Sequence, residues 1–509
     1  MKQRFEQSGR LLAVFTLGLA LALPWTTSRA AHDIRGITGN ITEAAGSEPR
    51  KATFNLYAAV FNMNLPEGSS VHMWGFGDAD LGANATHPFD PAVVPPDPPK
   101  PYGLGYGLPQ YPAPTLIVDQ GDQVTINLTN PDPWGVPQPV SIVVTGHTVT
   151  ATETVPGDGN DGGLVTEEAG TGETVSYTFT TGQPGTYIYH SMAGPNPGLQ
   201  TEMGLQGALI VRPAGFDATI GSPDRKAYAQ SGAEYDQEFL YLLTEVDPDL
   251  HFEVERGHYD HITHSDRSAK IWFVNGRVFP DLFQGDYNTL FPHQPYQSLA
   301  LAHPGDRVLV REVNAGSDSH PFHHHGENLR FIARDGRALS SDGSTADLGR
   351  SDNTLNSAPK QTVDMIWTWT GKGLNWDIYG STQGPMGGPQ YAHTCSNIAC
   401  PDTDSDGFDD VTGAICWDEV SKEYCPDHNK PFPVTLPGVG ELGLGGWWSG
   451  SPFLGDTGGL PPGEGGLNPF GGYFLVWHSH AEKELTTFDI FPGGSLSAVV
   501  VLPPDVPIE

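Results

Sequence analysis

The chain contains 509 residues, of which 60 are acidic and 26 are basic, so its formal net charge is -34. This negative balance argues against nucleic acids or anionic membrane surfaces as partners. Only 38% of the residues are hydrophobic, while 63 glycines and 45 prolines predict short strands joined by many turns rather than long helices. A chain of this length has room for about two to four domains.

Residues 1–30 have the pattern of an export signal. Basic residues precede an apolar run from Leu11 to Leu23, which is too short to span a bilayer comfortably. Ser28-Arg29-Ala30 offers small residues where signal peptidase cleaves. Cleavage after Ala31 is the less favoured alternative, and it would expose His32 as a new N-terminus. The sequence therefore predicts a secreted or periplasmic protein.

The cysteines agree with export. All four, Cys395, Cys400, Cys416 and Cys425, lie close together in the sequence. An even, clustered set in an exported chain predicts two disulfides that hold a local insertion. Three pairings are possible, and the sequence does not choose between them. A zinc site is less favoured because the spacing contains no CxxC pair.

Residues 31–220 are predicted to form a first β domain after a short polar lead-in. The segment from Thr115 to Thr129 contains a strand, a Gly-Asp turn and a second strand with alternating apolar residues. Further strands are predicted at 140–144, 174–180, 187–190 and 207–211. The spacing of strands and turns suits a Greek-key sandwich.

Residues 235–509 are predicted to form a second β domain. Strands are expected at 239–243, 271–277 and 308–314, and the second of these ends in an Asn-Gly turn. A Gly-Asp pair precedes the third strand as it does one strand of the first domain, which suggests a weak internal duplication. Residues from about 338 to 472 are interpreted as an irregular insertion that holds all four cysteines.

Histidines are concentrated at three places among the 19 in the chain. Residues 320–325 read His-Pro-Phe-His-His-His, residues 476–480 read Val-Trp-His-Ser-His, and residues 187–192 read Tyr-Ile-Tyr-His-Ser-Met. Because residues two apart on a strand point to the same face, His323 and His325 can converge on one ion. Three such clusters favour a metal site over isolated hydrogen-bonded histidines.

These motifs resemble those of the multicopper oxidase superfamily, which is built from cupredoxin domains. Residues 320–326 resemble the third copper motif, H-P-x-H-x-H-G, and residues 477–480 resemble the start of the fourth, H-C-H-x3-H. Residues 185–192 resemble the second motif, and residues 140–146 resemble the strand that carries the first. The resemblance covers about residues 50–215, 235–335 and 472–503.

The resemblance implies an all-β fold of two cupredoxin-like Greek-key β-sandwiches, with the long disulfide-held insertion in the second. His190 precedes His320 too closely for a whole domain to lie between them. The chain is therefore similar to two-domain members, in which the copper cluster lies between the first domain of one subunit and the second domain of the next. A homotrimer is then expected.

The family's blue type 1 copper is held by a cysteine and a histidine of the fourth motif and by the first histidine of the third. Here Ser479 and Glu484 stand at the first two positions, and only His320 remains. Serine supplies no soft thiolate, so the resemblance implies that a type 1 copper is absent. His320 and Glu484 are predicted to form a hydrogen-bonded pair, with a small mixed metal site as the alternative.

The family's other ligand positions hold a trinuclear copper cluster. At those positions this chain has Val143, Thr145 and Met192 in place of histidine, and the histidines that remain are His190, His323, His325, His478 and His480. The resemblance thus implies one or two copper ions rather than three. Met192 would favour Cu(I), because its thioether is soft.

The remaining histidines are interpreted as structural. His147 and His324 are expected to be solvated or to cap the backbone, and His72 to lie on a structural strand. Residues 258–264 contain three more histidines in a polar segment, where a loop is favoured over a metal site.

An acidic segment of the insertion has the pattern of a calcium loop, D-x-D-x-D-G-x-x-D. Carboxylates at alternating positions, a glycine for the turn and a backbone carbonyl are the oxygen ligands that Ca²⁺ prefers. Gly413 stands where an EF-hand has its bidentate glutamate, so the loop resembles thrombospondin type 3 or dockerin loops. The expected calcium ligands are Asp402, Asp404, Asp406, Phe408 and Asp410. A solvated acidic turn is the alternative.

Two functions remain open from the sequence. The first is an exported copper-binding oxidoreductase without a blue copper, acting on O2 or a small reducing substrate. The second is a metal-poor, non-enzymatic cupredoxin-like scaffold or binding protein. Loss of ligands in three of the four motifs favours the second, and the retained histidines favour the first.

Overall fold

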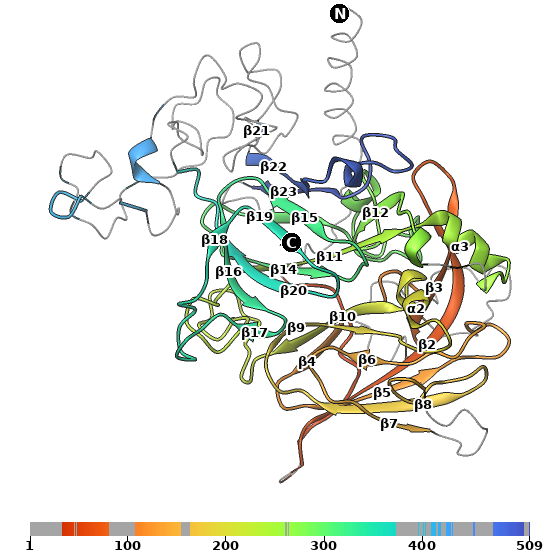
Figure 1. Cartoon of the computed structure of the whole chain (residues 1–509). Helices are drawn as coiled ribbons and strands as arrows, with labels where there is room; N and C mark the ends of the chain where they lie inside the picture. The colour runs from red at the N-terminus through yellow and green to blue at the C-terminus, as the bar shows by residue number, and fades with distance from the viewer. Residues whose placement is uncertain are drawn as a thin grey trace, which may run out of the picture.

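The computed structural model describes residues 33–80, 107–153, 163–372 and 472–502, without single positions 45, 47, 260, 261 and 263. It also describes strand 451–453, Ile508 and scattered residues between 395 and 430. The predicted signal segment, residues 1–30, lies outside the described residues. Figure 1 shows two β-sandwiches, the first drawn from red to yellow and the second from green to blue. The predicted all-β fold of two Greek-key sandwiches is confirmed.

The first sandwich consists of a six-stranded and a four-stranded sheet. The larger sheet contains β1 (Asn40–Thr42), β2 (Lys51–Asn64), β5 (Gln123–Thr129), β8 (Thr174–Thr180) and β7 (Thr150–Glu153), with β3 (Ser70–Asp78) beside β2. The smaller sheet contains β4 (Leu116–Asp119), β10 (Gln206–Arg212), β9 (Gly185–His190) and β6 (Val143–Val144). Val124, Ile126 and Leu128 alternate into the core between the sheets, as the sequence pattern predicts.

The second sandwich consists of a seven-stranded and a six-stranded sheet. The seven-stranded sheet contains β12 (Ile271–Val274), β11 (Gln237–Val246), β14 (Val308–Asn314), β20 (Thr362–Trp367), β16 (Leu329–Arg334) and β17 (Arg337–Ala338), with β18 (Ser351–Asp352) beside β16. The six-stranded sheet contains β13 (Leu299–Ala302), β23 (Leu496–Val501), β22 (Gly472–Ser479), β15 (His320–His324) and β19 (Thr354–Ser357), with β21 (Ser451–Phe453) beside β22. The six-stranded sheet carries most of the predicted metal ligands.

The predicted start of the insertion, near residue 338, is wrong. Residues 351–367 supply β18, β19 and β20, and β20 lies between β14 and β16 inside the seven-stranded sheet. The run Thr362–Trp367 is buried throughout, so it is a core strand between turn-rich segments. The described part of the second sandwich therefore continues to Lys372 before the insertion begins.

Few helices interrupt the strands in the part of the chain that the structure describes. These are α2 (Pro197–Glu202), α3 (Pro248–Glu255) and 3₁₀ turns at His264–Asp266, Asp281–Phe283, Cys425–Asp427 and Glu482–Leu485, the last of which is η6. Within the described ranges, no helix has the length and apolar character needed to cross a lipid bilayer.

The two sandwiches pack through one sheet of each, and β9 lies against β14 and β20 (Figure 1). Because β14 is covered on both faces, its side chains pack on one face into the core of the second sandwich and on the other face against the first sandwich. Val308 and Val310 belong to the core of the second sandwich, while Val313 packs against Ile188 of β9. The interface thus contains an apolar layer to which both sandwiches contribute side chains.

Candidate metal centre

The pairing of β15 with β22 brings four of the predicted ligands together. In this antiparallel register His323 lies directly opposite His478. Side chains two residues apart on a strand share a face, so His325 and His480 lie on the same side as this pair. The four residues are called the histidine cluster below.

The rings of the histidine cluster are in direct contact. Ring centroids are 4.8 Å apart for His323 and His325, 4.4 Å for His323 and His480, and 5.0 Å for His325 and His478. His323 and His325 are buried, His478 is half-buried and His480 is exposed. The cluster therefore lies on two inner strands of the six-stranded sheet, and His480 gives it solvent access.

Hydrogen bonds orient two of these rings. His478 Nδ1 donates to the backbone carbonyl of Ser479 at 2.8 Å, because a carbonyl can only accept. The other nitrogen, Nε2, therefore carries a lone pair, and it lies 3.1 Å from Nε2 of His325. Two imidazole nitrogens that bind the same ion, each at about 2.0–2.1 Å, can have this spacing. Nδ1 of His323 is bonded to the Thr354 hydroxyl at 2.7 Å, which leaves its Nε2 for a ligand.

Burial keeps His323, His325 and His478 neutral at physiological pH. Desolvation, reinforced by His480 and His478, lowers the pKa of His323 to about 4. Desolvation and the neighbouring His478 lower the pKa of His325 to about 3, and burial also lowers the pKa of His478. Neutral imidazole is the form that binds metal ions.

The cluster is not arranged around a single point. Within the described part of the chain, no set of three or more His, Cys, Asp or Glu side chains has the geometry to hold a metal ion. The ligand atoms of His325 and His478 are the pair that already has a suitable spacing. Binding by more residues requires side-chain rotation, which exposed His480 can make at the lowest cost.

His190 does not join the cluster. It ends β9 in the first sandwich, opposite Val143, and its Nδ1 donates to the Ser191 carbonyl at 3.2 Å. Burial, followed by the charge of Lys360, lowers the pKa of His190 to about 4. A neighbouring ammonium opposes a metal cation for the same electrostatic reason, so His190 is the least favourable of the five predicted ligands. Met192 is half-buried two residues later.

His320 lies on the opposite face of β15, at the position that the resemblance assigned to a type 1 copper. Its Nδ1 is 3.0 Å from Glu484 Oε2, and its Nε2 is 2.9 Å from Glu245 Oε2. Both ring nitrogens therefore have carboxylate partners, which leaves neither for a metal. The sequence gives no signal for Glu245, because it lies near the end of a buried strand and has no motif around it.

The expectation that His324 is solvated or capping is wrong. Its ring is buried in the core of the second sandwich, with its centroid 5.2 Å from that of Phe322 and 4.8 Å from that of Trp477. Neither ring nitrogen has a hydrogen-bond partner. Strand alternation explains the position, because His324 falls between the two outward ligands His323 and His325.

Replacement of His324 by Leu is expected to raise the free energy of unfolding by about 1–3 kcal/mol, because it removes a buried polar group without partners. Urea unfolding of both proteins measures the change. His147→Leu is the matched control: the ring of His147 bonds the Thr145 carbonyl at 3.0 Å, so this variant should gain nothing. A less stable His324→Leu protein would mean that the imidazole has a favourable partner in solution.

Of the predicted calcium loop, Asp402, Asp404, Asp406 and Phe408 lie outside the described residues. Asp410 is described, and its carboxylate accepts hydrogen bonds from the backbone and hydroxyl of Thr403. The disulfide pairing is partly described: Cys395 is bonded to Cys425. Cys416 is also disulfide-bonded, and Cys400 lies outside the described residues.

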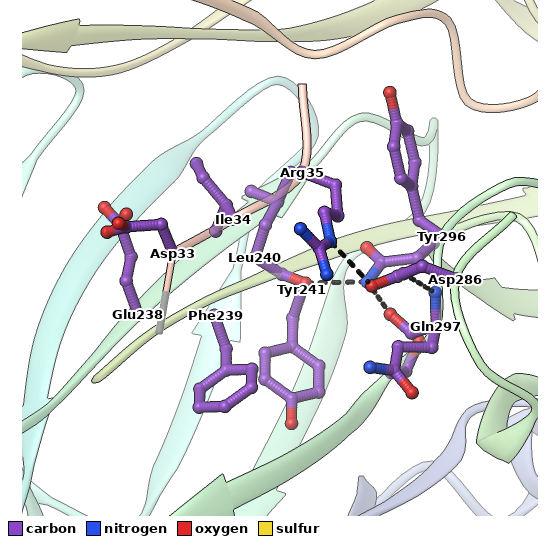
Figure 2. Close-up of a pocket in the computed structure, with 12 residues that line it drawn as sticks. Asp33, Ile34, Arg35, Glu238, Phe239, Leu240, Tyr241, Asp286, Tyr296 and Gln297 are labelled. Atoms are coloured by element: carbon purple, nitrogen blue, oxygen red, sulfur yellow. Dashed lines mark hydrogen bonds and ion pairs between the residues drawn. The ribbon is translucent and has the colours of Figure 1, made fainter. Parts of the chain in front are cut away.

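A small cavity lies between the N-terminal lead-in and β11. Figure 2 shows Arg35 and Asp286 facing each other across it, and their side chains form an ion pair at 3.3 Å. Its volume of about 50 Å³ is below the range of organic ligand sites, which starts at roughly 300 Å³. It is therefore not a candidate substrate pocket.

Comparisons with known proteins agree with the histidine motifs. A family model described as multicopper oxidase matches residues 109–215. An L-ascorbate oxidase of Cucurbita pepo var. melopepo is 34% identical over 104 residues, which are 20% of this chain and 17% of that protein. An L-ascorbate oxidase of Brassica rapa subsp. pekinensis is 31% identical over 137 residues, which are 27% of this chain and 20% of that protein.

The chain therefore matches a fifth or less of the length of these two relatives. Among solved structures, the blue copper oxidase of Nitrosomonas europaea has 16% identity and a TM-score of 0.45, covering 88% of this chain and 85% of its own. The segment matched by the family model includes β4 to β10 and carries His190. Over this segment the chain is similar to multicopper oxidases.

Proposed function

We propose that this protein is an exported copper-binding oxidoreductase of the multicopper oxidase type that works without a blue type 1 copper. The observation that carries the proposal is the histidine cluster, in which two neighbouring strands each contribute an outward His-x-His pair. Imidazoles in mutual contact are a donor set suited to copper.

The chain's own residues would prepare this centre. His325 and His478 would hold the ion first, with His323 and His480 as the further ligands, while His190 and Met192 remain candidates from the first sandwich. Thr354 and the Ser479 carbonyl orient the rings. Copper bound there would supply one-electron exchange with O2 or a small reducing substrate.

The absence of a type 1 copper is supported by its lost ligands. Ser479 is buried, and its hydroxyl accepts a hydrogen bond from the backbone of Ala481 at 3.1 Å. His320 is engaged at both nitrogens. Neither residue offers the soft thiolate or the open imidazole that a blue copper requires.

Other features of the proposal come from the sequence. Export through the signal peptide is supported by the Cys395–Cys425 disulfide, since such bonds persist in oxidising compartments. A structural calcium ion at residues 402–410, domain limits of 31–220 and 235–509, and a homotrimer that shares the copper centre between copies are parts of the same proposal.

The alternative function, a metal-poor scaffold, is favoured by a specific observation. Val143 and Thr145 replace ligands beside His190, and the histidine cluster lacks a ready site for three ligands among the described residues. A scaffold would use the same fold for binding or assembly without turnover. Metal content separates the two functions.

The deciding experiment is metal analysis of the copper-loaded, purified protein, with its absorption and paramagnetic resonance spectra. We expect copper to be retained without a strong band at about 600 nm, the signature of a Cu–thiolate site that this chain lacks. The double variant His323→Ala/His325→Ala should lose the bound copper, because it removes half of the cluster.

The matched control is His147→Ala/His258→Ala, which removes two histidines from positions outside the cluster. His258 is half-buried and pairs with Glu253, so copper retention should be unchanged. A wild-type protein with no copper after loading favours the scaffold. Copper that stays bound in the His323→Ala/His325→Ala variant would place the site elsewhere.

A further inference from the structure

His320 is held between two buried carboxylates that come from different parts of the fold. Glu245 is the last but one residue of β11 in the seven-stranded sheet, and Glu484 lies in η6, after β22 of the six-stranded sheet. The side chains of Glu245, His320 and Glu484 are 0%, 2% and 7% exposed. The triad therefore joins the two sheets of the second sandwich at a position that water does not reach.

Geometry fixes the number of protons in this triad. Glu245 Oε1 accepts from Arg267 Nη2 at 2.6 Å and from the backbone N–H groups of Ser317 and Asp318 at 2.6 and 2.9 Å, so this carboxylate is ionised. A neutral imidazole has one N–H, yet both nitrogens of His320 face carboxylate oxygens. The triad must hold a further proton, and histidine is the more basic partner.

Burial disfavours a charged imidazole, but the hydrogen bonds to Glu245 and Glu484 outweigh it and raise the pKa of His320 to about 10. Burial by itself would raise the pKa of Glu245. The hydrogen bond from His320 and the positive charges of His320 and Arg267 instead lower this pKa to about 2. The charged or titratable groups around the triad are Arg267, which also binds Glu202 at 2.5 Å, and Asp318, Glu312 and Lys360.

The triad lies at the ends of the two segments that carry the histidine cluster. His320 opens β15 three residues before His323, and Glu484 follows His480 after a short turn. The backbone N–H of His480 donates to the Pro321 carbonyl at 2.8 Å, and the Glu484 carbonyl accepts from Ser495 at 2.8 Å. The His320–Glu484 contact therefore closes the end of the β15–β22 pair that presents the ligands.

We propose that Glu245, His320 and Glu484 form a metal-free ionic clasp that fixes the ends of β15 and β22 and so positions the histidine cluster. The clasp fills the place of the missing type 1 copper with an imidazolium. It binds no copper itself, and its positioning role rests on the proposed function of the cluster. His320, Glu245 and Glu484 are thus positioning residues.

The test compares Glu484→Gln with Glu482→Gln, which changes an exposed glutamate of the same 3₁₀ turn. Both folded proteins are titrated with Cu(II), and the bound copper is examined by paramagnetic resonance. Because Glu484 holds His320 at the start of β15, its replacement should weaken copper binding at the histidine cluster. We expect this weaker binding and an altered copper spectrum in Glu484→Gln, and neither in Glu482→Gln.

A second measurement tests the clasp without copper. In ¹⁵N-histidine-labelled wild-type protein at pH 8, both ring nitrogens of His320 should resonate as protonated, and one should lose that signature in Glu484→Gln. Equal copper affinity and identical spectra in the two glutamine variants would overturn the positioning role. A neutral His320 at pH 8 would overturn the clasp. A wild-type protein that takes up no copper would instead refute the proposed function, and with it the positioning role.

Discussion

Replacement of Arg311 by Met is expected to lower the free energy of unfolding by about 3–5 kcal/mol, because it leaves the buried carboxylate of Asp364 without a cation. Arg311 Nε binds Glu238 at 2.6 Å, and its Nη1 lies 2.9 Å from the Thr186 hydroxyl and 3.3 Å from Asp364. Thr186 belongs to the first sandwich, whereas Arg311 and Asp364 belong to the second. The loss therefore acts on the packing of the two domains.

The network around Arg311 explains the size of this effect. Burial alone would raise the pKa of Glu238, but Arg212 and Arg311 lower it to about 2. Arg212 holds both oxygens of Glu238 at 2.7 Å and would remain in the variant. Asp364 would keep the hydroxyls of Thr186 and Tyr228 but no cation. Methionine preserves most of the packing volume, so the lost charge dominates.

Arg307→Met is the matched control, because Arg307 precedes the same strand and pairs with Asp236 near the surface. The Arg307 side chain is 40% exposed, so we expect a change below about 1 kcal/mol. Urea unfolding of both variants gives the comparison. Equal stability losses in the two variants would mean that the buried network does not bind the domains together.

Much of the fold can be predicted from local patterns in the sequence. The alternation of Val124, Ile126 and Leu128 predicts β5, and the Asn-Gly turn after β12 is present with both Asn275 and Gly276 at positive φ. The strands within residues 351–367 cannot be predicted in this way, because β18 and β19 are only two and four residues long. Their role depends on pairing with β14, β15 and β16.

The histidine cluster is also predictable in part, because each His-x-His pair is local and strand periodicity sets its face. The register that places His323 opposite His478 is not a local property of the sequence. The neighbouring residues in contact, His325 and His478, are 153 positions apart in the chain. The same limit applies to Glu245, which meets His320 across 75 residues. Glu484 was recognised because a family motif, rather than a local pattern, marks its position.

The stability that His320 contributes is expected to disappear as the pH rises. Its pKa is about 10 in the folded protein and about 6.5 in an unfolded chain. A raised pKa stabilises the fold fully below about 6.5, and this stabilisation declines until the pH passes about 10. The free energy of unfolding of wild type should exceed that of His320→Gln by roughly 3–5 kcal/mol near pH 6 and by far less at pH 10.

Glu245 sets the lower pH limit of this stabilisation. Its pKa is about 2 in the folded protein and about 4.3 in an unfolded chain, so it stabilises the fold at pH values above about 4.3. That contribution is lost as the pH falls toward 2, so the triad is most stabilising between about pH 4.5 and 6.5. Glu312 titrates within the pH range over which His320 loses its stabilising effect, because burial raises the pKa of Glu312 to about 8. It is present in both proteins, so most of its effect cancels from the difference.

Urea unfolding of wild type and His320→Gln at several pH values between 5 and 10 measures this difference directly. His258→Gln is the control, because its contact with Glu253 is exposed and should be worth less than about 1 kcal/mol. A difference between wild type and His320→Gln that stays constant from pH 5 to pH 10 would require a neutral His320. In that case a carboxyl proton, not an imidazolium, would join Glu484 to β15, and the clasp would lose its charge while keeping its hydrogen bonds.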